Sequence, residues 1–142
     1  MSNYQDLINS IEIYRKRYRG PESPDLAIGP LYDLFPHKEP AFLDCELKWP
    51  DTWANSSKSG IYVFIDLNLN ILYVGKSTRI SSRLSVYCAY DNDKCKLKHS
   101  GWSSEPRYLL TVGVPDDMKW EASGLEEYLI SKLKPIDNTR IL

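Results

Sequence analysis

Two short runs of β-branched and aromatic residues constrain the fold of this chain most strongly. The first covers residues 60–65 with the sequence GIYVFI, and the second covers residues 71–75 with the sequence ILYVG. Side chains of these types favour strands. Residues 66–70 (DLNLN), which lie between the runs, contain the Asp and Asn residues that favour turns. We therefore predict that the two runs pair as an antiparallel hairpin.

Three helices and one further strand complete the predicted fold. Apolar residues recur at three- and four-residue spacing over residues 4–18, and residues 78–89 and 117–133 also read as helices. Residues 107–114 (RYLLTVGV) predict a third strand. We therefore predict an α/β fold in which a small three-stranded antiparallel sheet is flanked by helices.

The first 59 residues differ in character from the rest of the chain. Six prolines lie within residues 20–58 and make regular structure difficult there, yet the same segment carries large apolar residues that a free linker would lack. We predict an N-terminal helix and an ordered, irregular arm over residues 1–59, and a main domain over residues 60–142. The basic cluster at the end of the helix fits either a solvated helix end or phosphate contacts: Arg15, Lys16, Arg17 and Arg19.

The charge of the chain is unevenly distributed. A formal net charge of -1 argues at first against a nucleic-acid-binding protein. Residues 75–100, however, hold six basic side chains against two acidic ones. The candidate DNA contacts in this window are Lys76, Arg79, Arg83, Lys94, Lys96 and Lys98. Without a large uniform positive field, we expect binding to free DNA to be weak and strongly salt-dependent.

Other sequence features bear on the cellular compartment. The N-terminus lacks the charged-then-apolar build of a signal peptide, and no apolar run approaches the roughly 20 residues that cross a bilayer. The three cysteines, an odd count, fit free thiols in a reducing compartment. We therefore expect a cytoplasmic protein with no membrane partner.

Two strand tyrosines are candidate site residues. Tyr62 and Tyr73 fit ordinary core aromatics, but Gly60 precedes one and Gly75 follows the other, and glycine lets backbone or ligand approach closely. Lys76 follows at the end of the second strand. A lysine near a tyrosine hydroxyl lowers the phenol pKa and helps it to accept a proton.

Arg83 and Tyr87 share one face of the predicted helix over residues 78–89, because they lie four residues apart. Arg83 fits an ordinary surface arginine whose stem covers apolar surface. It also fits a guanidinium that grips a phosphate and stabilises its developing charge.

One carboxylate of the last predicted helix is unusual. At about 100° per residue, Glu126 falls within the apolar arc of this helix, whereas Glu121 and Glu127 fall outside it. A buried carboxylate is unfavourable unless it is paired or bound to a metal, so Glu126 fits either a buried ion pair or a metal ligand. Asn138, just beyond Pro135, fits a helix end or a turn.

These residues resemble the GIY-YIG nuclease family. Residues 60–62 (GIY) and 73–75 (YVG) are similar to its two signature triplets, with Val74 where isoleucine is usual. The remaining elements of the family follow in its order over residues 60–138, and the resemblance is closest to the excision-repair nuclease branch. The matching residues are Tyr62, Tyr73, Lys76, Arg83, Tyr87, Glu126 and Asn138.

The resemblance implies a DNA endonuclease that hydrolyses phosphodiester bonds with one Mg²⁺ or Mn²⁺ ion held by Glu126. Tyr62 would accept a proton from the attacking water with Lys76 as its electrostatic helper, and Arg83 would stabilise the transition state. The water, the phosphate and the metal shell would be positioned by Tyr73, Tyr87 and Asn138.

The sequence is also compatible with other functions. A DNA-binding module could keep the fold without turnover, and a small-molecule or protein-binding domain would leave Lys76, Arg83 and Glu126 together by coincidence. The nuclease could also act as a homodimer or as a subunit of a larger repair, restriction or mobile-element complex. The sequence does not identify the DNA target.

Overall fold

A central antiparallel sheet forms the middle layer of the molecule. The computed structural model describes residues 1–36, 38, 53–91, 94–98 and 100–138. Within them, β3 (Gly60–Asp66) lies between β4 (Ile71–Ser77) and β7 (Pro106–Gly113), and it is antiparallel to both. The predicted hairpin and third strand are confirmed. The register places Tyr62 opposite Gly75 on one side and Thr111 on the other.

Two short strands from the N-terminal arm extend this sheet beyond the three predicted strands. β1 (Ala27–Ile28) and β2 (Tyr32–Asp33) both pair with the outer edge of β7. A buried ion pair joins the arm to the sheet, because Arg107 Nε lies 2.7 Å from Asp33 Oδ1. Strands of two residues between prolines carry no alternation of apolar and polar residues, so the sequence does not reveal them.

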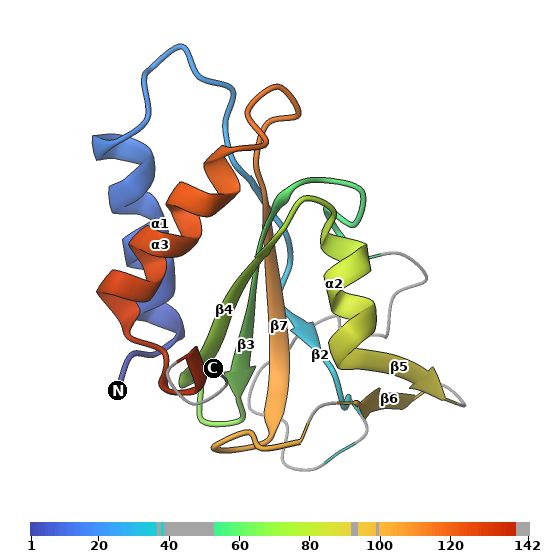
Figure 1. Cartoon of the computed structure of the whole chain (residues 1–142). Coiled ribbons are helices and arrows are strands. Elements are labelled where there is room, and N and C mark those ends of the chain that lie inside the picture. Colours follow the sequence, from blue (N-terminus) through green and yellow to red (C-terminus); the bar gives the residue numbers. More distant parts are fainter. Residues whose placement is uncertain (37, 39–52, 92–93, 99, 139–142) are drawn as a thin grey trace.

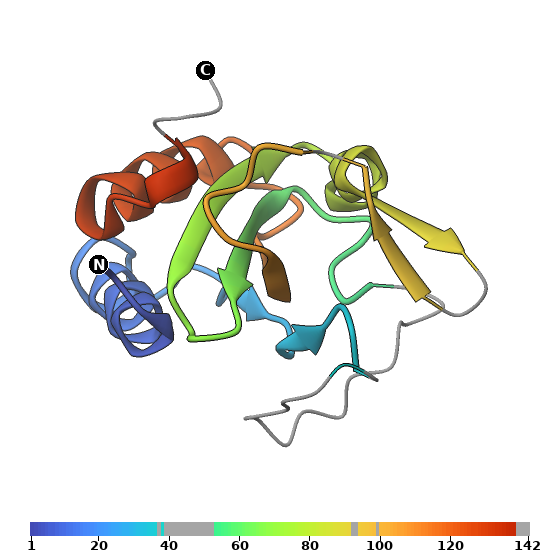
Figure 2. The ribbon, with the colours of Figure 1, turned by 90° about the horizontal axis from the view of Figure 1, so that it is seen from below.

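Helices cover both faces of the sheet (Figures 1 and 2). α1 (Tyr4–Arg17) and α3 (Glu121–Leu133) pack together on one face, and α2 (Ile80–Tyr87) lies on the other. A short 3-10 helix, η1 (Ile136–Asn138), follows α3. None of the helices in the described ranges is long and apolar enough to cross a membrane.

The helix boundaries differ from the sequence expectation at two places. α2 is shorter than predicted at both ends, and the chain after it forms a small hairpin of β5 (Cys88–Asp91) and β6 (Lys94–Leu97). α3 begins four residues later than predicted. The β5–β6 hairpin escapes sequence reasoning because its residues mix cysteine, lysine and aspartate and offer no continuous apolar face.

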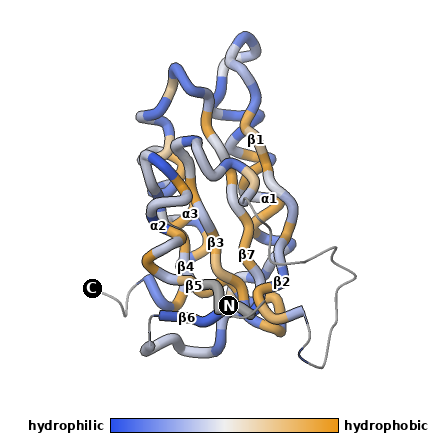
Figure 3. The backbone as a smooth tube through the Cα atoms, turned by 90° about the vertical axis from the view of Figure 1, so that its right-hand side faces the viewer, coloured by the Kyte–Doolittle hydropathy of each residue, from blue (hydrophilic) through white to orange (hydrophobic). Residues whose placement is uncertain are grey.

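The apolar core is centred on the two inner strands. Every residue of β3 and of β7 is buried, and the hydrophobic colour of Figure 3 is concentrated along these strands. A strand covered by helices on both faces reads as a continuous apolar run. β4 lies at the edge of the sheet, which leaves one side of its backbone without a neighbouring strand.

Candidate active site

Gly75 is required for the position of Tyr62, and Gly60 is required for the packing of two strands. A Cβ atom on Gly75 would lie 2.3 Å from Cζ of the Tyr62 ring, so only glycine lets the ring lie across β4 at this point. A Cβ atom on Gly60 would lie 2.1 Å from the carbonyl oxygen of Val112, so glycine also permits the close approach of β3 and β7. The two glycines of the sequence pattern are therefore packing requirements, Gly75 for the Tyr62 ring and Gly60 for the approach of β3 to β7.

Three tyrosines from three elements meet on the α2 face of the sheet. The ring centroids of Tyr62 and Tyr87 are 5.7 Å apart, those of Tyr73 and Tyr87 are 5.9 Å apart, and those of Tyr62 and Tyr73 are 6.2 Å apart. Tyr62 is buried, at 1% exposure, whereas Tyr73 is only partly buried. The sequence-predicted tyrosines thus form one cluster.

The phenol of Tyr62 is protonated at neutral pH in the free protein. Burial raises the pKa of Tyr62 well above its ordinary value, and the neighbouring Tyr87 raises it further. The hydrogen bond with Arg83 acts in the opposite direction without cancelling the effect of burial. Burial likewise raises the pKa of Tyr73.

Arg83 is a cation that contacts the tyrosine cluster. Its Nη2 donates to the Tyr87 hydroxyl at 3.5 Å, and its guanidinium lies 5.7 Å from the centroid of the Tyr87 ring. Arg83 is otherwise exposed, so its guanidinium is open to an incoming phosphate while it remains held beside the phenols.

Lys76 lies on the other side of β4 from Tyr62, although the sequence places them near each other. Successive side chains of a strand point to opposite faces, so Gly75 faces Tyr62 and Lys76 faces away. Lys76 is exposed, and its Nζ donates to Ser123 Oγ of α3 at 3.1 Å. Its charge acts on Glu126.

Glu126 is a half-buried carboxylate on α3. Burial raises the pKa of Glu126, and the positive charge of Lys76 offsets this rise in part. The charge of Glu126 in turn raises the pKa of Tyr73. The carboxylate is therefore within electrostatic reach of both Lys76 and Tyr73.

The side-chain amide of Asn138 holds the exposed edge of β4. Its Oδ1 accepts from the Val74 backbone N–H at 2.8 Å, and its Nδ2 donates to the Val74 carbonyl at 2.9 Å. This pair of bonds replaces the missing neighbouring strand. Asn138 thereby fixes the backbone at Val74, between Tyr73 and Gly75, because its amide bonds both the N–H and the carbonyl of Val74.

Two further residues beside the cluster escaped sequence reasoning. The centroid of the Trp102 ring lies 6.1 Å from the ring centroid of Tyr87 and 6.2 Å from that of Tyr73. Asp137, which is fully buried, accepts hydrogen bonds from the backbone N–H and the hydroxyl of Ser103 and so holds the loop that carries Trp102. Neither residue lies in a periodic pattern, so no sequence signal marks it.

Glu121 is the fully buried acid of α3, contrary to the helix geometry derived from sequence. Its side chain is 3% exposed and lies 2.7 Å from Arg19 Nε. The Tyr14 hydroxyl donates to the same carboxylate at 2.8 Å. Glu121 falls outside the apolar arc that faces the sheet, but α1 covers this second side of the helix. Burial opposes ionisation, yet Arg19 and Tyr14 lower the pKa of Glu121.

The predicted DNA contacts are distributed around α2. Arg79, Lys96 and Lys98 are exposed, and Lys98 Nζ donates to the Ser85 carbonyl at 2.8 Å. The side chain of Lys94 lies outside the described set. In the basic cluster of α1, Arg15 pairs with Asp25 and Arg19 is buried against Glu121, whereas Lys16 and Arg17 are exposed.

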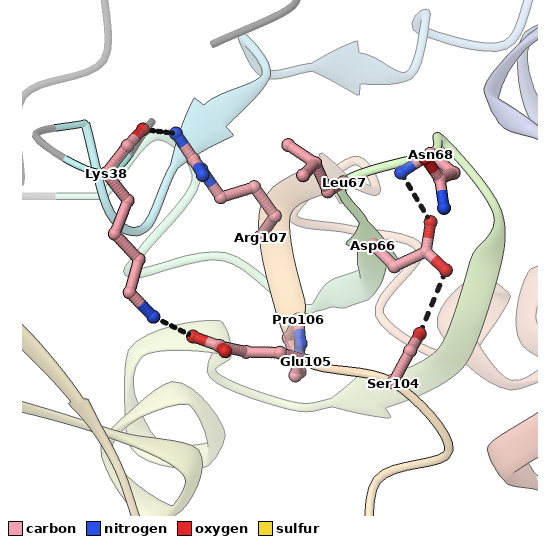
Figure 4. A pocket seen from close by; sticks show the side chains of 8 residues that line it. All are labelled: Lys38, Asp66, Leu67, Asn68, Ser104, Glu105, Pro106 and Arg107. Carbon is pink, nitrogen blue, oxygen red and sulfur yellow. Dashed lines mark hydrogen bonds and ion pairs between the residues drawn. The ribbon is translucent and has the colours of Figure 1, made fainter. Parts of the chain in front are cut away.

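Two of the cavities in the described part of the chain contain basic side chains. One, of about 330 Å³, adjoins the site and is lined by Ser59, Lys76, Ser77, Thr78, Arg83, Lys119, Ala122 and Ser123. The other, of about 340 Å³, lies at the far end of β3 (Figure 4). There the Ser104 hydroxyl donates to Asp66, and Arg107 pairs with Asp33, so these charged groups are engaged in structural bonds.

Comparison with known proteins gives matches over the same part of the chain. The family model described as the UvrC-like GIY-YIG domain matches residues 58–139. The UvrABC system protein C of Prochlorococcus marinus is 34% identical over 87 residues, which cover 56% of this chain and 12% of the relative. The protein of the same name from Helicobacter pylori is 30% identical over 86 residues, which cover 56% of this chain and 14% of the relative. No solved structure matches the chain.

Proposed function

This chain belongs to the family of UvrC-like GIY-YIG domains, and we propose that it is a DNA endonuclease that hydrolyses phosphodiester bonds. The observation that carries the proposal is the convergence of four elements on one site. Tyrosines from β3, β4 and α2, the Arg83 guanidinium and the Glu126 carboxylate come together from residues far apart in the sequence.

Glu126 is the proposed ligand of a divalent cation, Mg²⁺ or Mn²⁺. Its carboxylate is partly buried, and burial raises its pKa, so a bound cation would relieve an unfavourable charge. No group of three or more His, Cys, Asp or Glu side chains is placed to hold a metal among the residues that the structure describes. A single carboxylate fits a hard cation that keeps several waters and takes further ligands from a substrate phosphate. The bound ion would supply positive charge that polarises the phosphate and favours ionised neighbouring groups.

The side chains of the site divide the chemistry between them. Arg83 would bind the phosphate and stabilise the negative charge that develops on it. Tyr62 would accept the proton of the attacking water, with Arg83 as the cation that favours the ionised phenol. Tyr73 and Tyr87 would position the water and the phosphate.

Lys76 and Asn138 would act from the periphery of this site. Lys76 lies beside Glu126, where its charge keeps the carboxylate more readily ionised. Asn138 would act as a positioning residue through the backbone of Val74. The exposed Arg79, Lys96 and Lys98 would follow the DNA backbone as non-specific contacts.

The relatives suggest a place for this activity. The chain spans only 12% and 14% of the length of the two UvrABC system proteins that it matches. We propose that it supplies the nuclease activity of a DNA repair process and that further contacts come from a partner subunit or a second copy. The family match and the weak overall charge support this proposal.

A plasmid-nicking assay tests the function. Purified protein is incubated with supercoiled plasmid and either Mg²⁺, Mn²⁺ or excess chelator, in parallel with Glu126→Ala. We expect nicking by the wild-type protein with a divalent cation and background nicking by the variant. Equal, background-level nicking by both proteins would exclude the enzyme, and salt-sensitive DNA binding without nicking would instead support a binding module.

A further inference from the structure

The cavity beside the start of α3 is lined by cations. Lys76, Arg83 and Lys119 contribute to its wall, together with the hydroxyl groups of Ser77 and Thr78. Its described lining residues include no carboxylate. Three cations and several hydroxyl donors around a cavity of about 330 Å³ favour an anion such as a phosphate group.

A large exposed aromatic residue directly follows Lys119, one of the residues that line this cavity. Trp120 is the residue that immediately precedes α3, and it is 71% exposed. It lies in the chain between Lys119 and Ala122, both of which line the cavity. The Ser59 hydroxyl donates to the Lys119 carbonyl at 3.0 Å, which ties this turn to the start of β3. The backbone that carries the exposed ring is therefore fixed next to Lys119.

Acidic groups offset part of the positive charge of the cavity, because the charge of Glu126 acts on Lys76, but two acidic side chains near Trp120 are paired with cations that do not line the cavity. Asp116 in the preceding loop pairs with Lys58 at 3.5 Å, and the Glu121 carboxylate is buried against Arg19. Asp117 is exposed. An exposed aromatic ring beside clustered cations is the combination that binds unpaired nucleic acid, because the cations contact phosphates and the ring stacks on a base.

We propose that this cavity binds a phosphate next to the one that is cleaved and that Trp120 stacks on an unpaired base of the same strand. The inference rests on the proposed function and adds a substrate feature to it. The preferred DNA has unpaired bases on the α3 side of the cleaved bond, and fully paired DNA leaves Trp120 without a stacking partner.

Equilibrium binding separates the two contacts. Fluorescence anisotropy is measured with a labelled single-stranded oligonucleotide and with its duplex, in chelator so that no cleavage occurs. Trp120→Ala should weaken single-strand binding by at least about fivefold, because base stacking on an aromatic ring contributes that much or more. Trp120→Phe, which keeps an aromatic ring, should retain most of the affinity. Duplex binding should be equal for all three proteins.

The lysine is tested by the salt dependence of the same binding. Lys119→Ala should reduce the slope of log affinity against log salt by about 0.7, the value for one phosphate contact on a single strand. Trp120→Ala should leave the slope unchanged. Lys132→Ala, which removes an exposed lysine at the other end of α3, is the matched control and should change neither quantity.

The inference is overturned if Trp120→Ala binds the single strand as tightly as the wild type, or if it loses equal affinity for the duplex. The first result would leave Trp120 free for a contact with another protein. If Trp120→Ala binds the single strand as tightly as the wild type while the wild-type protein nicks plasmid, the role of Trp120 is refuted and the nuclease function is retained. Selective single-strand binding by a protein that never nicks would refute the nuclease alone.

Discussion

The ring of Tyr62 occupies the space that a side chain at position 75 would need. Gly75→Ala would place a methyl group 2.3 Å from the ring, and the rigid ring cannot yield without leaving the tyrosine cluster. We therefore expect Gly75→Ala to lower both the melting temperature and the nicking rate. Gly124→Ala is the matched control, because a Cβ atom there meets nothing within 4 Å.

The control variant Gly124→Ala should stabilise the protein by roughly 0.5–1 kcal/mol, since alanine is preferred over glycine inside a helix. Thermal unfolding of both variants measures the difference. If both substitutions changed the melting temperature in the same direction, contact with the Tyr62 ring would not explain why position 75 is glycine.

The pH dependence of cleavage should follow the ionisation of Tyr62. A tyrosine accepts a proton only when it is ionised, and burial raises the pKa of Tyr62, so the ionised fraction is small at neutral pH and increases with pH. The cleavage rate of the wild-type protein should therefore rise with pH through the neutral range.

Tyr62→Phe should be slower by about 10²–10⁴-fold, the usual contribution of a general base, and should lose the rise with pH. Initial rates of oligonucleotide cleavage over a pH series measure both effects. A Tyr62→Phe variant that kept the pH dependence of the wild type would assign the base to another residue.

The residues of the candidate site could be chosen from sequence, but the contacts among them could not. The resemblance picks out Tyr62, Arg83 and Glu126 because their order along the chain is diagnostic. Which cation touches the buried phenol depends on the alternation of side chains along β4 and on the position of α2. Arg83 occupies that place and Lys76 does not, and only the three-dimensional arrangement shows it.

At the scale of elements, α1 and α3 are joined by a buried network at the start of the helix that carries Glu126. Arg19 and Glu121 are 5% and 3% exposed at their side chains, and Tyr14 completes the network. Removing one partner of a buried pair leaves an uncompensated charge, which costs about 3–5 kcal/mol. We expect Glu121→Gln to lose about this much free energy of unfolding at neutral pH.

The loss of stability in Glu121→Gln should become smaller as the pH falls. Arg19 and Tyr14 lower the pKa of Glu121, so its contribution to stability is complete above its ordinary pKa and is lost as the pH falls through the lowered value. Denaturant unfolding of the wild type and of Glu121→Gln should therefore converge in strongly acidic solution. Glu105→Gln is the control, because its exposed pair with Lys38 contributes about 0–1 kcal/mol. A Glu121→Gln variant as stable as this control at neutral pH would contradict the role of the network.

The elements that sequence predicts well are those with continuous apolar or periodic patterns. β3, β4 and β7 are visible because their residues favour strands and are mostly buried, and α1 is visible because its apolar residues recur at helical spacing. β1 and β2 exist only because β7 offers them an edge, so their own residues do not reveal them. The burial of Glu121 is likewise not visible in the sequence, because it depends on packing against α1 and not on the apolar pattern of α3 itself.

For the molecule as a whole, β4 divides the site, with the tyrosine cluster and Arg83 on the α2 side and Lys76 and Glu126 on the α3 side. β4 carries Tyr73 and Gly75 toward the tyrosine cluster and Lys76 toward α3, while Asn138 holds the edge between them. The net charge of -1 therefore does not describe the site, where cations surround a cavity beside a single metal-binding candidate.

We propose that Glu126 serves catalysis at some cost to the stability of the folded protein. Burial raises the pKa of Glu126, so the ionised carboxylate destabilises the folded protein at neutral pH, and Glu126→Gln should raise the melting temperature there. Glu127→Gln, on the exposed face of the same helix, is the matched control.

The decisive measurement is the nicking rate of these two variants and the wild type with Mg²⁺ or Mn²⁺, together with their melting temperatures. Glu126→Gln should be more stable than the wild type and lose nicking by a factor on the order of 10²–10³ or more, as expected for a group that stabilises charge in the transition state. Glu127→Gln should nick at the wild-type rate. Equal nicking by Glu126→Gln and Glu127→Gln would contradict the proposed nuclease site.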